Sequence, residues 1–246
     1  MTLYEIISIV NLVILALSLV VLGRLLFAGR LSEKYLRLGP TRELHQPVWV
    51  YFFVVAVVLL YSTVKLTVTG EQPPAIVLGT ELIPYALVGL MIGRARSIDA
   101  GFRKIGLVPR WPGRDTCWGL IGGVIGLGLA GAVGMAVNFV STKLGQPIDP
   151  VGHEALQTLR DEFSVELLVA LTISAVILAP LVEELVFRGA LQTSLLRLFG
   201  ERRWPALLIA SAVFSIIHHS VVPWQGLIPL FVLGLVFGYV YERTGS

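Results

Sequence analysis

Two neighbouring carboxylates lie within an apolar stretch of this sequence. Glu183 and Glu184 follow Pro180 and precede Arg188, and the residues around them are otherwise hydrophobic. Ionisable side chains are costly inside an apolar membrane helix, so their presence there indicates a function. A carboxylate with a suitable neighbour can act as a general base on water, which is the chemistry of peptide hydrolysis.

The spacing gives these side chains different environments. Glu184 and Arg188 are four residues apart with the acid on the N-terminal side, which is the favourable order for a helical ion pair. Glu183 lies about 100° around the same helix and has no arginine of its own. Two carboxylates in unlike environments are typical of a base beside a structural partner. The pattern therefore favours Glu183 as the base.

A histidine in the next apolar run is the second candidate. His218 lies four residues after Phe214, so the two side chains share one face of a helix. A lone membrane histidine is often only a packed, hydrogen-bonded residue. Together with a carboxylate, an imidazole can activate water for attack on a carbonyl group. We therefore expect Glu183 and His218 to face one cavity.

Zinc is the alternative to a metal-free site. A catalytic zinc ion usually takes three protein ligands and a water, and the His-Glu-x-x-His motif of zinc proteases does not occur in this sequence. His218 and His219 are adjacent, so a regular helix cannot direct both at one ion. We favour a site without a cofactor, and Glu183 and His218 are the expected ligands if a metal is bound.

The composition indicates that membrane helices position these residues. Of the 246 residues, 55% are hydrophobic and 14% are charged, whereas a soluble domain has roughly 25% charged residues. We expect an all-α, multi-pass transmembrane bundle. No cluster of basic and aromatic residues forms a nucleic-acid face, so no nucleic-acid partner is expected. The single cysteine, Cys117, excludes an intramolecular disulfide.

Seven apolar runs approach the length of about 20 residues that a transmembrane helix needs. They lie at 4–26, 48–69, 75–93, 116–140, 166–188, 204–219 and 227–241. Most Lys and Arg side chains fall in the stretches 24–47, 94–115 and 189–203. Because positive charges concentrate in cytoplasmic loops, these stretches are predicted to be cytoplasmic and the N-terminus external.

These boundaries conflict with a shared site. Glu183 lies near the cytoplasmic end of its predicted span and His218 near the outer end of the next. At about 1.5 Å per residue, their depths would differ by more than roughly 10 Å. A common site needs the first helix to continue through residues 189–198, or the second to start deeper. The apolar run from Glu166 to Phe199 is long enough for the first arrangement.

The order and spacing of these residues resemble the CPBP family of intramembrane proteases, which includes the type II CAAX prenyl endopeptidases and the abortive-infection-like proteins of bacteria. Three stretches carry the resemblance: Glu183-Glu184-x-x-x-Arg188-Gly189, Phe214-x-x-x-His218 and Leu233 to Gly245. The resemblance divides the chain into variable leading helices at 1–115 and a protease core at 116–246.

The resemblance implies an intramembrane endopeptidase of the bacterial cytoplasmic membrane. Its partners would be the lipid bilayer and a membrane-embedded or lipidated peptide, such as a prenylated CAAX-like or hydrophobic one. Glu183 would activate water, Glu184 and Arg188 would support it, and His218 would complete the base. A His-x-x-x-Asn motif on an eighth helix, expected after Ser246, would stabilise the oxyanion, so we expect a truncated core with reduced activity.

Two other classes of function stay open. A non-catalytic membrane protein of the same fold could act in immunity or regulation by binding a partner, but the intact carboxylates and histidine favour the peptidase. A transporter could use the same charges as a proton relay. The sequence contains no inverted repeat of broken helices, which many transporters have.

Overall fold

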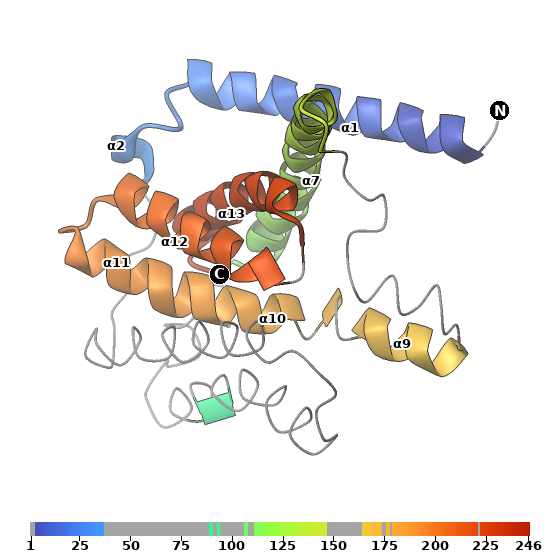
Figure 1. Ribbon diagram of the computed structural model, residues 1–246. Helices are drawn as coiled ribbons and strands as arrows, with labels where there is room; N and C mark the ends of the chain where they lie inside the picture. The colour runs from blue at the N-terminus through green and yellow to red at the C-terminus, as the bar shows by residue number, and fades with distance from the viewer. Residues whose placement is uncertain are drawn as a thin grey trace.

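All regular elements in the described part of the chain are helices. The computed structural model describes residues 3–36, 89–90, 93, 106–107, 111–146, 164–173, 176–177, 179–220 and 222–246. Most helices within these ranges pack against one another, whereas that at 165–173 stands apart from them (Figure 1), and the absence of strands in these ranges confirms the all-α class. The predicted span at 48–69 and most of the span at 75–93 lie outside the described residues.

Three of the described helices are long and apolar enough to cross a membrane. They are α1 (Leu3–Phe27), α7 (Pro112–Lys143) and α13 (Trp224–Thr244). They coincide with the predicted spans at 4–26, 116–140 and 227–241, so the chain is a membrane protein. The predicted total of seven spans is not confirmed.

Glycines allow α7 and α13 to approach closely. A Cβ atom on Gly122 would lie 2.5 Å from Cγ2 of Val240, and one on Gly126 would lie 2.9 Å from Cδ1 of Leu233. Real side-chain atoms do not come so close, so neither position tolerates a larger residue without a shift of its neighbour. Small residues in lipid serve this purpose, because packing rather than hydrophobicity holds membrane helices together.

The helix with the paired carboxylates extends further than its predicted span. After α9 (Val165–Ile173), the chain forms α10 (Ala179–Glu183), the π-helix η2 (Glu184–Gln192) and α11 (Thr193–Leu198). The last three follow one another along a single path (Figure 1). The predicted boundary at 188 is therefore wrong.

The histidine is carried by the next helix, α12 (Arg203–Ile217), which ends in the 3-10 turn η3 (His218–Ser220). With 15 residues, α12 is shorter than a full crossing of the bilayer. It returns along η2 and α11 and contacts both. The helices form a hairpin whose open end holds both sequence motifs.

Apolar side chains fill the space between the two arms of this hairpin. They come from η2, α11 and α12: Leu185, Val186, Phe187, Leu191, Leu195, Leu196, Ala206, Ala210 and Phe214. All of them are buried. Because core side chains interdigitate, this cluster fixes how the two helices lie against each other.

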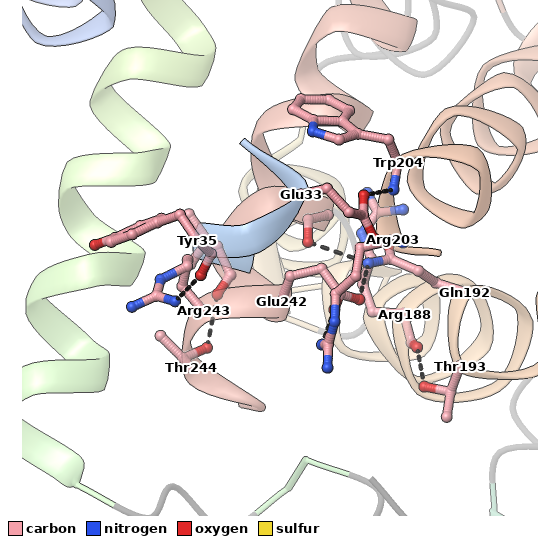
Figure 2. Close-up of polar contacts among 12 residues, drawn as sticks. Glu33, Tyr35, Arg188, Gln192, Thr193, Arg203, Trp204, Glu242, Arg243 and Thr244 are labelled. Atoms are coloured by element: carbon pink, nitrogen blue, oxygen red, sulfur yellow. Dashed lines mark hydrogen bonds and ion pairs between the residues drawn. The ribbon is translucent and has the colours of Figure 1, made fainter. Parts of the chain in front are cut away.

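The short helix α2 (Glu33–Leu36) docks on the beginning of α12. The Glu33 carboxylate accepts hydrogen bonds from the backbone N–H groups of Arg203, at 2.6 Å, and Trp204, at 3.2 Å (Figure 2). The Trp204 indole donates to the carbonyl oxygen of Leu31 at 2.7 Å. The first N–H groups of a helix have no partner within it, so Glu33 satisfies two groups that would otherwise be unpaired.

The same segment holds the end of α13. The Tyr239 hydroxyl donates to the carbonyl oxygen of Arg30 at 3.1 Å. The Arg243 guanidinium donates to the carbonyl oxygen of Tyr35 at 2.7 Å (Figure 2). The guanidinium also lies 4.0 Å from the centre of the Tyr35 ring. The ends of α1, α12 and α13 thus meet at one place, as expected if the stretches that flank them share one side of the membrane.

Candidate active site

The hairpin brings the predicted base and the predicted histidine together. Nε2 of His218 lies 3.4 Å from Oε1 of Glu183. Glu183 ends α10 and His218 directly follows α12, so both lie at the open end of the hairpin. The depth difference expected from the initial spans is wrong, because the helix continues through residues 189–198. About a third of the Glu183 side chain stays exposed.

A backbone contact fixes the role of each imidazole nitrogen. Nδ1 of His218 lies 2.7 Å from the carbonyl oxygen of Phe214. A carbonyl oxygen only accepts hydrogen bonds, so Nδ1 carries the hydrogen and a neutral imidazole presents a lone pair at Nε2. A lone pair and a carboxylate repel each other unless a proton lies between them. Nε2 is therefore the nitrogen that faces the Glu183 carboxylate.

The predicted ion pair of Glu184 and Arg188 is present. Nε of Arg188 lies 3.4 Å from Oε1 of Glu184. The Arg188 side chain is completely buried, whereas that of Glu184 is 43% exposed. Within the described ranges, no acceptor forms a hydrogen bond with the three guanidinium nitrogens. Glu184 is thus the main compensation for a charge held in the core.

The ring of Phe214 links this ion pair to the histidine. Its centre lies 5.2 Å from Cζ of Arg188 and 4.7 Å from the centre of the His218 ring. Phe187 packs edge-on against it at 5.3 Å. A guanidinium is attracted to the face of an aromatic ring. Phe214 thus separates Arg188 from His218 and contacts both, which explains why phenylalanine precedes the histidine by one helical turn.

A second buried ion pair, which the sequence analysis missed, joins three helices. Arg203 pairs with Glu242, and Nε2 of Gln192 donates to Oε1 of Glu242 at 2.7 Å and to the carbonyl oxygen of Gly238 at 3.1 Å (Figure 2). The predicted cytoplasmic stretch 189–203 places Arg203 in a loop, but its side chain is 4% exposed. The sequence feature that could have predicted this pair is Glu242, a carboxylate at the end of an apolar helix that needs a cation as its partner.

Glu183 differs from Glu184 and Glu242 in the kind of side chain with which it pairs. Glu184 and Glu242 are each paired with an arginine, which stays charged at any ordinary pH. The partner of Glu183 is His218, which can gain or lose a proton near neutral pH. Of these three carboxylates in the described part of the chain, Glu183 is the one whose partner can itself gain or lose a proton.

The fit to a metal ion is incomplete. In the part of the chain that the structure describes, no group of three or more His, Cys, Asp or Glu side chains could hold a metal. Glu183 and His218 supply two converging donors, and His219 is exposed. A catalytic zinc site usually needs a third protein ligand.

A comparison with protein families finds one family model that covers all four of these site residues. Residues 165–246 match the family model described as "Type II CAAX prenyl endopeptidase Rce1-like". The matched region runs from α9 to α13 and includes Glu183, Glu184, Arg188 and His218. The match confirms the resemblance predicted from the sequence motifs. No curated protein and no solved structure matches the chain.

Proposed function

We propose that this protein is an intramembrane endopeptidase of the bacterial cytoplasmic membrane. Its substrate would be a membrane-associated peptide that is cut near a prenylated or otherwise hydrophobic C-terminus. The observation that carries the proposal is the contact of 3.4 Å between Nε2 of His218 and Oε1 of Glu183. The matched family, which is named for CAAX prenyl endopeptidases, supports the class of substrate.

In the proposed reaction, a water molecule binds beside the carboxylate of Glu183. Glu183 takes one proton from this water, and the water oxygen attacks the carbonyl carbon of the scissile peptide bond. His218 shares the proton while its Nδ1 stays bonded to the Phe214 carbonyl. When the bond from carbon to nitrogen breaks, the proton passes to the leaving amine and the base is regenerated.

The Glu184–Arg188 pair supports this base without taking part in proton transfer. Arg188 is buried against Phe214, whose ring in turn contacts His218. Glu184 compensates the charge of Arg188, so the cation need not pair with Glu183. In this arrangement Glu183 stays available for the water.

We propose that the water is activated without a metal, because within the described residues Glu183 and His218 are the two donors that converge there. Metal analysis of the purified protein should give no stoichiometric zinc, and strong chelators should leave the rate of cleavage almost unchanged. One tightly held ion per chain, lost together with activity on chelation, would contradict the metal-free mechanism.

The substrate class is tested with matched peptides in proteoliposomes. Two peptides of one sequence ending in a CAAX motif, with and without a prenyl group on the cysteine, are incubated with the full chain, and the products are identified by mass spectrometry. We expect cleavage of the prenylated peptide and much slower cleavage of the other. Equal rates would contradict the lipid-dependent substrate class, and cleavage of neither would contradict the peptidase assignment.

A further inference from the structure

Ser215 joins the end of α12 to α13. It lies in the last turn of α12, three residues before His218, and it is buried. Its hydroxyl donates a hydrogen bond to the carbonyl oxygen of Leu227, in the first turns of α13. A hydrogen bond needs a particular length and direction, which the apolar contacts around it do not. The bond therefore selects one arrangement of the two helix ends.

Close packing between the same helices lies one turn away from this bond. A Cβ atom on Gly234 would lie 3.1 Å from Cβ of Ser211 and 3.2 Å from Cδ1 of Phe214. Both distances are shorter than most contacts of a real Cβ atom, so glycine allows α13 to approach α12 here. Small residues serve this purpose in membrane helices. Ser211, Phe214 and Ser215 thus share the face of α12 that lies against α13.

The beginning of α13 lacks one of the hydrogen bonds of a regular helix. Pro229 lies inside this helix. Proline has no N–H group, so it cannot bond to the carbonyl of Gln225, four residues earlier. Leu227 lies between these two positions. The hydroxyl of Ser215 thus contacts the part of α13 in which the helix has one internal bond fewer.

His218 lies at the same end of α12 and is held there by two local contacts. Its carbonyl oxygen accepts a hydrogen bond from the N–H group of Val222 at 3.0 Å, and its Nδ1 lies 2.7 Å from the carbonyl oxygen of Phe214. These contacts fix the imidazole relative to the end of α12. The bond of Ser215 fixes that end relative to a separate helix, α13.

The distance between Glu183 and His218 depends on where this end of α12 lies. α12 contacts α13 and also the arm of the hairpin that carries Glu183 (Figure 1). The last carbonyl groups of a helix have no partner within it, and helix ends fray. A hydrogen bond in the last turn limits this movement. It thereby helps to maintain the distance of 3.4 Å between Nε2 of His218 and Oε1 of Glu183.

We infer that Ser215 is a positioning residue for His218. Its hydroxyl ties the last turn of α12 to the Leu227 carbonyl and so holds the imidazole beside Glu183. Ser215 acts through His218 and not on the water or the substrate. The kinetic part of the inference rests on the proposed peptidase function, whereas the geometric part does not.

The kinetic test compares Ser215→Ala with Ser211→Ala in the full chain, with the prenylated peptide in proteoliposomes. Both serines are buried on α12, one turn apart. The Ser211 hydroxyl bonds to none of the residues that the structure describes, so it is the matched control. Because a displacement near 1 Å can cost a factor of about 10², we expect Ser215→Ala to lower kcat about 10- to 100-fold with KM nearly unchanged. Ser211→Ala should behave as wild type.

A spectroscopic test reads the geometry without activity. The chain has 4 histidines, so ¹⁵N-histidine labelling gives few signals, and the resonances of His218 are those lost in His218→Gln. Glu183→Gln should change the Nε2 resonance of His218, because it alters the group that faces this nitrogen. Ser215→Ala should change the same resonance, and Ser211→Ala should leave it as in the wild type.

Ser215→Ala is expected to fold. Leu227 lies inside α13, where a carbonyl oxygen is the regular acceptor of the N–H group four residues later. Loss of the hydroxyl should therefore not leave this oxygen without a partner. If Ser215→Ala does not fold, Ser215→Cys replaces it, because a thiol is only a weak donor.

The outcomes separate this inference from the proposed function. A wild-type Nε2 resonance in Ser215→Ala would overturn the positioning role, and so would an equal change of the resonance in Ser211→Ala. A changed resonance with a wild-type kcat would overturn the kinetic part. If Glu183→Gln cleaves the peptide as fast as wild type, the proposed function fails, yet the resonance still decides whether Ser215 positions His218.

Discussion

Arg188 is completely buried, whereas Glu184, the carboxylate that pairs with it, reaches the surface. Their closest atoms are 3.4 Å apart, and 43% of the Glu184 side chain is exposed. The charge of Arg188 therefore needs compensation by its partner more than the charge of Glu184 does. The cation is enclosed by protein, while the carboxylate is partly exposed.

We predict that the two partners differ in their effect on stability. Glu184→Gln leaves a buried cation without compensation, which should lower the free energy of unfolding by about 3 kcal/mol. Arg188→Met keeps most of the buried volume and leaves a carboxylate that is already partly exposed. Its loss should be nearer 1 kcal/mol, from the contact with the Phe214 ring. Thermal unfolding in detergent measures both, and equal losses would contradict the asymmetry.

The stability losses caused by replacing Arg203 and Glu242, which form a buried ion pair, should not add. Replacing one partner leaves an uncompensated charge, so Glu242→Gln and Arg203→Met should each lower the free energy of unfolding by about 3–5 kcal/mol. The double variant Glu242→Gln/Arg203→Met should recover most of that loss, because no buried charge remains. A double variant as unstable as the sum of the single ones would show that the two residues act independently.

Helical periodicity predicted much of the candidate site. The spacing of Glu184 and Arg188 gave their ion pair, and the spacing of Phe214 and His218 gave their shared face. Both follow from the α-helical repeat, which holds over one turn. The π-helix from Glu184 to Gln192 could not be found in this way, because the analysis assumes 3.6 residues per turn.

Hydropathy and charge predicted where helices occur more accurately than where those helices begin and end. The apolar run from Glu166 to Phe199 gave no internal signal for a boundary at residue 188, and the observed helix continues to Leu198. The positive-inside rule counts basic residues near span ends without regard to their partners. It therefore could not distinguish the buried Arg203 from the exposed Arg202 beside it.

The contact of Glu33 with α12 predicts a stability effect from outside the matched region. Glu33→Ala removes the acceptor of two backbone N–H groups at the start of the helix. Loss of such a cap typically costs about 1 kcal/mol. Lys34→Ala is the matched control, because Lys34 is the exposed neighbour. Unfolding in detergent should show a loss for Glu33→Ala only, and equal stability of the two variants would argue against the cap.

The role of Glu183 as the base is the central claim. The decisive measurement is the initial rate at which proteoliposomes with wild type, Glu183→Gln or Glu201→Gln cleave the prenylated peptide. Glu201 is the matched control, because its carboxylate forms a surface ion pair with Arg197 at 3.0 Å. Loss of a general base typically costs about 10² to 10⁴ in rate, so Glu183→Gln should be slower by at least about 10² and Glu201→Gln unchanged. Cleavage by Glu183→Gln at the wild-type rate would contradict the account.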